Sequence, residues 1–223
     1  MRADWLGPAL AVHVPRLAAA YRLELRLPER DRVALTFDDG PHPQGTPAVL
    51  AELDRRGARA TFFLVGEQVA RDPGLAREVA DAGHEIALHG YRHTLLLRRR
   101  VAELAADLDR AAAAIADATG AAPRLYRPPY GVFSSGSLAH VRARGWRPLL
   151  WSRWGRDWER RATASSIARR ATAGLRPGDV VLLHDSDAYS STDSWRKTTG
   201  ALPSLLDAVA TLGVPASPVT HST

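Results

Sequence analysis

The sequence predicts an α/β fold with mostly parallel strands, because short runs of β-forming residues alternate with longer runs of helical periodicity. The strands are expected at 33–37, 60–65, 84–88, 125–127, 148–151 and 180–183. The helices are expected at 47–56, 67–82, 100–119, 137–144, 164–173 and 199–212. A glycine follows each expected helix, where a left-handed residue commonly ends it, at Gly57, Gly83, Gly120, Gly145, Gly174 and Gly213.

The segment 100–119 is the clearest expected helix. Its apolar residues recur at spacings of three and four, which predicts a stripe buried against the sheet. They are Val101, Leu104, Leu108, Ala111, Ala112 and Ile115.

Composition describes an ordinary globular domain. The 223 residues are 45% hydrophobic and 24% charged, so the chain is long enough for one well-buried core. There is no cysteine, so a metal would have to be held by histidine and carboxylate groups. Polar residues and prolines interrupt the start of the chain, and we expect no membrane span or export signal there. The sequence as written favours a cytoplasmic protein, or an extracellular one if an export signal has been removed or lies upstream.

The formal charge of +6 is carried almost wholly by arginine, with local clusters at 98–100, 160–161 and 169–170. Such an excess suits anionic surroundings such as a cell wall, a membrane surface or nucleic acid. We favour solvated helix faces instead, because no basic stripe interleaves with aromatic residues. We therefore expect no nucleic-acid partner. We also expect the protein to be a monomer.

Two adjacent carboxylates, Asp38 and Asp39, close the expected strand at 33–37 and precede Gly40. In a pocket of low dielectric they repel each other unless a cation binds one of them. A metal ligand beside a free base is therefore one interpretation. A solvated Asp-Asp-Gly turn is the other.

His89 and His93 favour the metal interpretation over a pair of exposed histidines. A spacing of four brings both imidazoles to one face if the chain turns helical after the strand at 84–88. Nitrogen and carboxylate oxygen without sulfur suit zinc or a similar divalent transition metal. The positions of the polar residues also favour a functional site. Several of them stand at the ends of expected strands, and barrels of parallel strands build their active sites at that rim. These are Asp38, Asp39, His89, Arg127, His184 and Asp185.

Five segments, in order, resemble the motifs of the polysaccharide deacetylase family, carbohydrate esterase family 4. They are 36–41 (Thr-Phe-Asp-Asp-Gly-Pro), 89–93 (His-Gly-Tyr-Arg-His), 127–131 (Arg-Pro-Pro-Tyr-Gly), 157–158 (Asp-Trp) and 182–185 (Leu-Leu-His-Asp). The resemblance implies a distorted (β/α) barrel of about seven parallel strands, a divalent metal, and hydrolysis of acyl groups on acetylated sugars. We expect residues 1–30 to form an N-terminal extension packing on the barrel and 31–223 the catalytic domain.

The resemblance also implies roles for single residues. Asp39, His89 and His93 would bind the metal, zinc first and cobalt as a possibility. Asp38 would be the general base, and Arg127 would orient it, because a guanidinium grips a carboxylate well.

The same motifs imply a general acid, His184, whose charge state Asp157 helps to set. The backbone N–H of Tyr130 would stabilise the oxyanion. Leu182 and Trp158 would line a pocket for the acetyl methyl group, with ordinary core packing as the alternative.

Two features depart from the common pattern. Gly90 stands where the family often has Ser or Thr, so a hydroxyl that would brace the metal loop is missing. Trp151 and Trp154 precede the fourth motif, and Tyr189 and Trp195 lie in the polar run 186–198. Such aromatic residues either stack on sugar rings or are buried under a loop.

The predicted activity is removal of acetyl groups from N-acetylglucosamine-containing glycans, peptidoglycan or chitin-like oligomers. The alternatives are a deacylase of a small-molecule or lipid-linked amino sugar, an acetylxylan esterase, and a catalytically silent glycan-binding module. The silent module is disfavoured because the base, the ligands and the acid are all present.

Overall fold

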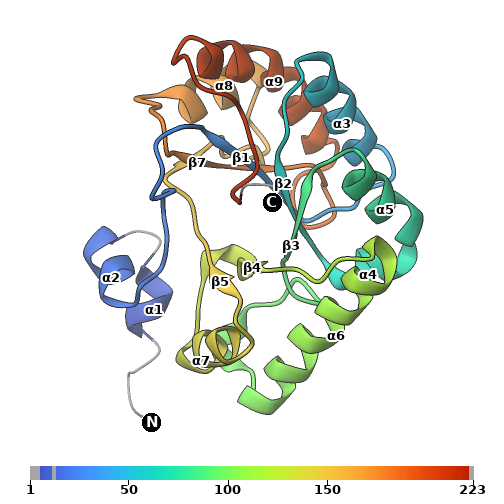
Figure 1. Ribbon diagram of the computed structural model, residues 1–223, viewed down its shortest axis with the longest axis vertical. Helices are drawn as coiled ribbons and strands as arrows, with labels where there is room; N and C mark the ends of the chain where they lie inside the picture. Colours follow the sequence, from blue (N-terminus) through green and yellow to red (C-terminus); the bar gives the residue numbers. More distant parts are fainter. Residues whose placement is uncertain (1–5, 12–13, 221–223) are drawn as a thin grey trace.

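The computed structural model describes residues 6–11 and 14–220. Within them, seven short parallel strands form one curled sheet with helices packed outside it (Figure 1). The strands are β1 (Ala34–Asp38), β2 (Thr61–Leu64), β3 (Glu85–Leu88), β4 (Leu125–Tyr126), β5 (Arg147–Pro148), β6 (Arg153–Trp154) and β7 (Val180–His184). Their order across the sheet is β5-β4-β3-β2-β1-β7-β6. The distorted (β/α) barrel predicted from the sequence is confirmed.

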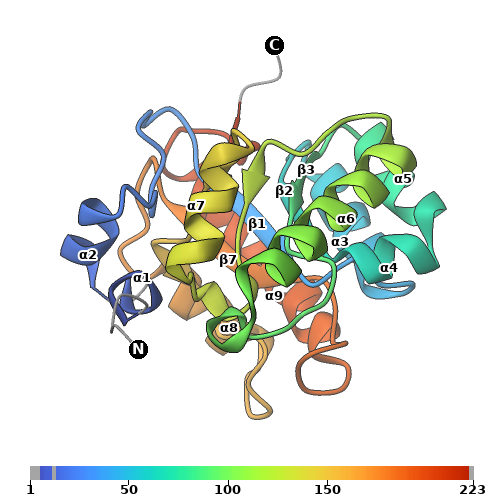
Figure 2. The same cartoon turned by 90° about the horizontal axis from the view of Figure 1, so that it is seen from below.

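The helices are α1 (Leu6–Leu10), α2 (Pro15–Ala20), α3 (Gly45–Arg55), α4 (Gly66–Arg71), α5 (Pro73–Asp81), α6 (Val101–Thr119), α7 (Ser135–Ala143), α8 (Ala164–Thr172) and α9 (Ser194–Ala210), with short 3₁₀ turns at η1 (Leu96–Arg98) and η2 (Pro129–Gly131). Helices α3 to α9 cover the outer face of the sheet, whereas α1 and α2 lie to one side of it, as both ribbon views show (Figures 1 and 2). The apolar stripe of α6 is buried from Leu104 to Ile115, whereas Val101 at its start is 59% exposed.

The strand register brings the carboxyl ends of the strands to one rim. Asp38, the last residue of β1, pairs with Phe63 on one side and with His184 on the other. Leu88, which ends β3, pairs with Tyr126, which ends β4. The residues that follow these positions therefore meet at the same edge of the barrel, as predicted.

Several element boundaries differ from the prediction. The expected helix 67–82 is two helices, because Pro73 has no N–H to continue the first one and Asp72 caps the second through the Leu75 N–H at 3.0 Å. Helix α9 begins at Ser194, before the expected start at 199, and the two-residue strand β6 is not among the expected strands. The six glycines predicted to end helices all have positive φ, between 58° and 79°.

The segment before β1 lies along the open side of the sheet. Glu24 bridges to Leu149, which follows β5, and Arg26 bridges to Asp179, which precedes β7. Leu23 and Leu27 are buried in the core. The predicted division of the chain after residue 30 stays a prediction, and residues 1–5 and 12–13 of that extension lie outside the described residues. Across 6–11 and 14–220, no helix combines the length and apolarity needed to cross a bilayer.

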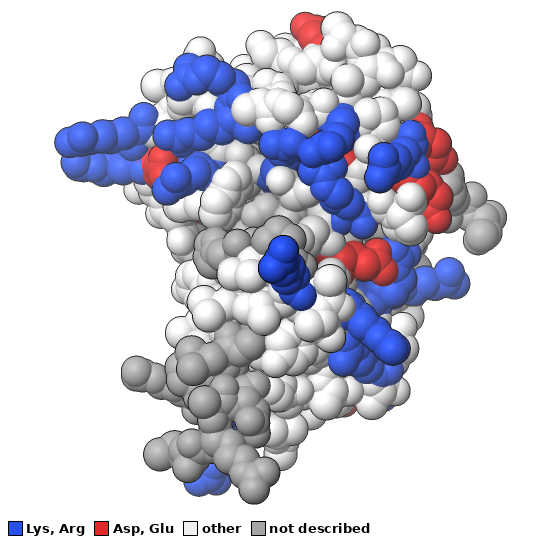
Figure 3. Space-filling model, turned by 90° about the vertical axis from the view of Figure 1, so that its left-hand side faces the viewer, with Lys and Arg blue, Asp and Glu red and all other residues white. Residues whose placement is uncertain are grey.

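Basic side chains gather in a band on one face of the molecule (Figure 3). Four arginines also influence one another near the start of β7, where the buried carboxylate of Asp179 contacts both Arg26 and Arg153. Burial lowers the pKa of Arg26, and the neighbouring Arg176, Arg153 and Arg30 lower it further against the opposing effect of Asp179. The positive charge is therefore unevenly distributed, and the solvated helix faces favoured from the sequence stay a prediction.

Candidate active site

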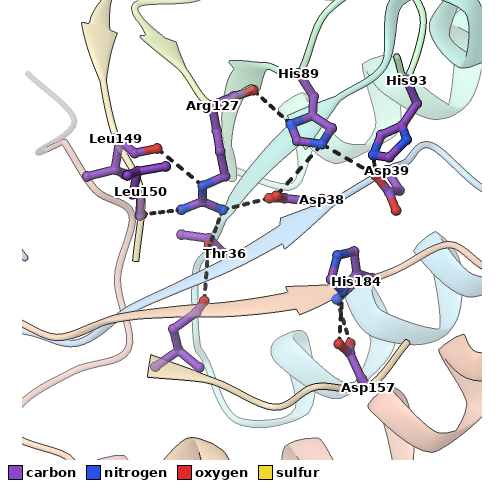
Figure 4. A network of polar contacts seen from close by, with 11 residues as sticks. Thr36, Asp38, Asp39, His89, His93, Arg127, Leu149, Leu150, Asp157 and His184 are labelled. Carbon is purple, nitrogen blue, oxygen red and sulfur yellow. Dashed lines mark hydrogen bonds and ion pairs between the residues drawn. The ribbon is translucent and has the colours of Figure 1, made fainter. Parts of the chain in front are cut away.

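One cavity of about 540 Å³ at the carboxyl-terminal rim contains most of the residues predicted from the sequence. Its lining consists of Asp38, Asp39, His89, His93, Tyr130, Gly131, Trp151, Trp154, Trp158, Leu182, His184, Tyr189, Ser190 and Ser191. Arg127 and Asp157 are fully buried behind it, in contact with Asp38 and His184 (Figure 4). A larger hollow of about 800 Å³ lies at the other end of the barrel and contains none of the predicted site residues.

Arg127 fixes the carboxylate of Asp38. Its Nη1 donates to Asp38 Oδ1 at 2.6 Å and to the Thr36 hydroxyl at 2.9 Å. Its Nε and Nη2 donate to the carbonyls of Leu149 and Leu150 at 3.3 and 2.8 Å. Every nitrogen of the guanidinium therefore has an acceptor, and the side chain cannot rotate away from Asp38 without losing several hydrogen bonds.

The same arginine orients His89 through its main chain. His89 Nδ1 lies 2.8 Å from the Arg127 carbonyl oxygen. Because a carbonyl only accepts, Nδ1 carries a proton, and in the neutral imidazole the lone pair is then on Nε2. Nε2 lies 3.4 Å from Asp39 Oδ1 and 3.9 Å from Asp38 Oδ2 (Figure 4). A carbonyl behind an imidazole in this way fixes the tautomer that a metal requires.

Asp39, His89 and His93 form a cluster of three donors. One ligand atom from each lies within 4.8 Å of the others, and Asp39 Oδ1 is 3.3 Å from His93 Nε2. Asp39 itself has a φ of 79°, a backbone conformation that a non-glycine residue adopts only where its surroundings hold it.

The protonation states of this cluster suit a cation. Burial alone would raise the pKa of Asp39, but the adjoining His89 and the charges of His184 and His93 lower it to about 2. Burial lowers the pKa of His93 to about 4. Within the described part of the chain, the buried Asp39 Oδ1 has no hydrogen-bond partner. An ionised carboxylate with an unsatisfied oxygen, beside the imidazole of His89 and the neutral imidazole of His93, fits zinc or a similar divalent metal.

The two histidines converge without a helix between them. Residues 89–93 form an irregular turn in which Gly90 has a φ of 94°, so the chain does not turn helical after the strand. The N–H groups of Gly66 and Glu67, at the start of α4, donate to the carbonyls of Gly90 and Tyr91 at 2.8 and 2.9 Å. The turn is therefore held in place by the neighbouring helix.

His184 is bound at two points by Asp157. The imidazole Nδ1 lies 2.9 Å from Asp157 Oδ1, and the main-chain N–H donates to Oδ2 at 2.7 Å. Burial alone would lower the pKa of His184, but Asp157, with the charges of Asp39 and Asp38, raises it to about 10. His184 is therefore protonated at neutral pH and can donate a proton into the cavity.

Tryptophans form one wall of the cavity. The rings of Trp158 and His184 are nearly perpendicular, with their centres 5.4 Å apart. The ring centres of Trp154 and Trp158 are 5.7 Å apart. Both rings are partly exposed and line the cavity. They are therefore placed where a sugar ring could stack on them and are not buried under a loop. Leu182 is 3% exposed at the base of this wall. Trp195, in contrast, is buried and does not line the cavity; its ring centre lies 6.1 Å from that of His42.

Two tyrosines contact the imidazole of His93. Tyr130 is 59% exposed and presents its ring edge at 4.7 Å, whereas Tyr189 stacks flat on the imidazole at 4.3 Å and 12°. The Tyr189 hydroxyl donates to Glu67 at 2.7 Å and accepts from Gln68 at 3.1 Å.

The sequence left Tyr189 between stacking on a sugar ring and burial under a loop, and it gave no sign of the contact with His93 or of the roles of Glu67 and Gln68. It also missed Thr198, whose hydroxyl donates to Asp157 at 2.8 Å. No local motif marks these residues, because their contacts join segments far apart in the chain.

Comparison with known proteins agrees with this geometry. The model of the polysaccharide deacetylase family matches residues 26–149. The chain is 38% identical over 194 residues to a chitooligosaccharide deacetylase of Bradyrhizobium sp. (strain ANU 289), covering 84% of this chain and 88% of that protein.

A second relative is the peptidoglycan-N-acetylglucosamine deacetylase PgdA of Listeria monocytogenes, 35% identical over 154 residues and 69% of this chain. The match covers 32% of PgdA, so this chain spans about a third of that relative. The crystal structure of the Bc1960 peptidoglycan N-acetylglucosamine deacetylase superposes with a TM-score of 0.83 at 27% identity, over 90% of this chain and 92% of that one. The chain belongs to the polysaccharide deacetylase family.

Proposed function

We propose that the protein hydrolyses acetyl groups from N-acetylglucosamine-containing glycans, with a divalent metal, zinc first, at Asp39, His89 and His93. The observation that carries the proposal is the position of Asp38. This buried carboxylate is fixed by Arg127 beside the three-donor cluster, and the protonated His184 lies on the neighbouring strand. A free base and a charged acid next to a metal cluster are the parts that amide hydrolysis requires.

A bound divalent cation would supply positive charge to polarise the acyl carbonyl and acidify water. In the proposed reaction, Asp38 accepts the proton of the water that attacks the acyl carbon. His184 donates its proton to the amine nitrogen, so that the C–N bond breaks and acetate and a free amine result. The Tyr130 N–H donates to the carbonyl oxygen as negative charge develops on it. Arg127 and Asp157 keep the base and the acid oriented.

The cavity wall supports an acetylated sugar as substrate. Leu182 and Trp158 offer an apolar surface of the kind that a methyl group requires, and the partly exposed ring of Trp154 extends that surface outward. A flat indole face matches the apolar face of a sugar ring. The names of the Bradyrhizobium and Listeria relatives support N-acetylglucosamine as that sugar.

The test is acetate release by the chelator-stripped protein with zinc, cobalt or nothing added back. The substrates are N-acetylglucosamine oligomers, peptidoglycan and acetylated xylan. The proposal predicts release that returns only with metal and that is fastest on an N-acetylglucosamine glycan. Metal binding without release from any polymer would contradict the glycan assignment, and a protein that binds no metal would instead match the silent glycan-binding module.

A further inference from the structure

The segment that contains both histidines, residues 89–93, is held on its outer side by α6. The Tyr91 N–H donates to Oδ2 of Asp107 at 2.9 Å. The other oxygen of Asp107 lies 3.2 Å from Arg99 Nη1, and this nitrogen also donates to the Thr94 hydroxyl at 3.3 Å. The carboxylate therefore links Tyr91, in the middle of the histidine segment, to Thr94, which directly follows the segment. The link to Thr94 runs through Arg99.

The ring of Tyr91 is fixed by the same helix. The guanidinium of Arg110, one turn after Asp107 on α6, lies 3.8 Å from the ring centre. On the other side, a β-carbon at Gly66 would lie 2.7 Å from the ring, so α4 leaves no room for the ring to shift. Tyr91 is 9% exposed as a result.

Gly90 makes this arrangement possible. Its φ of 94° is one that side-chain-bearing residues rarely adopt. A β-carbon there would lie 3.4 Å from the Arg92 carbonyl and 3.7 Å from the carboxylate of Asp107. These are ordinary contact distances, so it is the positive φ that makes the hydroxyl-bearing side chain common in relatives strained here, and a carboxylate from α6 lies beside the turn.

We propose that Asp107 is a positioning residue for the metal site. Its carboxylate holds residues 89–93 in the conformation that brings both imidazoles to Asp39, in place of the hydroxyl missing at position 90. The inference rests on the proposed function in one respect, that the three-donor cluster binds a metal. Asp107 does not line the cavity and acts only through the histidine segment.

The experiment measures the affinity of the full chain for zinc alone, by calorimetry or by competition with a chelator. Asp107→Ala removes the acceptor for the Tyr91 N–H and the partner of Arg99. We expect it to weaken zinc binding about tenfold or more, as loss of a group that orients metal ligands commonly does. Asp107→Asn keeps an acceptor oxygen and should lie between Ala and the wild type. The absorption spectrum of the cobalt-substituted protein should broaden in the same order.

Asp109→Ala is the matched control on the same helix. Asp109 is 41% exposed and pairs with His140 and Arg144, away from the histidine segment. Its loss should leave zinc affinity unchanged. If Asp107→Ala and Asp107→Asn bind zinc as tightly as Asp109→Ala, the positioning role is overturned while the metal site stands. If the wild type binds no zinc, both the role and the proposed function are overturned.

Gly90→Ser gives an independent outcome, because it restores the hydroxyl common in relatives. The positive φ predicts that it weakens zinc binding several-fold. Tighter binding in this variant would show that the turn lacks a brace, and would overturn the role assigned to Asp107.

Discussion

Asp157 accepts two hydrogen bonds from His184, one from its main-chain N–H at 2.7 Å and one from its imidazole at 2.9 Å. The carboxylate is fully buried, so solvent screens its charge poorly from the imidazole. One residue therefore sets both the position and the protonation of the proposed acid.

The first prediction concerns Asp157→Asn and the dependence of kcat on pH. The pKa of His184 is raised to about 10, so its protonated form is retained through neutral pH and lost as the pH rises through that value. Removing the charge of Asp157 lowers this pKa, so kcat should begin to fall at a lower pH than in the wild type. A cation bound at Asp39 would offset the effect of the Asp38 and Asp39 carboxylates on His184, and Asp157 would then be the main group that raises this pKa. An alkaline limb that does not move would contradict the role of Asp157.

The second prediction concerns Arg127, the partner of Asp38, and the stability of the fold. Arg127→Ala leaves a buried carboxylate without its cation and should lower the free energy of unfolding by about 3–5 kcal/mol. Arg127→Lys should cost less, because an ammonium can still reach Asp38 while the carbonyls of Leu149 and Leu150 lose their donors. Urea denaturation measures both. The exposed pair of Arg196 and Asp193 is the control, and Arg196→Ala should change stability by less than about 1 kcal/mol.

The third prediction concerns Tyr189, which stacks on His93. Tyr189→Ala removes the ring and should weaken zinc binding roughly two- to tenfold, the equivalent of about 0.5–1.5 kcal/mol for a stacked pair. Tyr189→Phe keeps the ring and loses the hydrogen bonds to Glu67 and Gln68, so zinc affinity should be retained. Equal zinc affinity in all three proteins would show that the ring does not orient His93.

The fourth prediction concerns Trp158 and the substrate. Trp158→Ala removes an apolar wall of the cavity and should raise KM for an N-acetylglucosamine oligomer about two- to tenfold. Trp146 lines the hollow at the other end of the barrel, and Trp146→Phe is the control that should leave KM unchanged. An unchanged KM in Trp158→Ala would place the sugar elsewhere.

The parallel barrel was predictable because its signals are local. Six glycines end helices with positive φ, and the polar residues that follow the strands meet at one rim because parallel strands share a direction. Asp38, Asp39, His89, His93 and His184 all lie in one cavity for that reason. The splitting of the expected helix 67–82 was also open to prediction, since Pro73 has no N–H to donate.

Contacts between distant segments were not predictable from one sequence. Asp107 was treated only as part of an amphipathic helix, and its hydrogen bond to Tyr91 depends on how α6 packs beside the histidine segment. The contact of Tyr189 with Glu67 likewise joins the loop after β7 to the start of α4. The two residues of β6, Arg153 and Trp154, stand between Ser152 and Gly155 and form no run of β-forming residues, so no local pattern marks this strand.

The most direct test of the central claim compares two adjacent substitutions, Asp38→Asn and Asp39→Asn, by zinc content and acetate release. Asp38→Asn should keep one zinc per chain and lose turnover by about 10²–10⁴-fold, because it removes the base and spares the ligands. Asp39→Asn should lose zinc, because it removes a ligand. Loss of zinc in Asp38→Asn, or full zinc content in Asp39→Asn, would contradict the division of the two carboxylates into base and ligand.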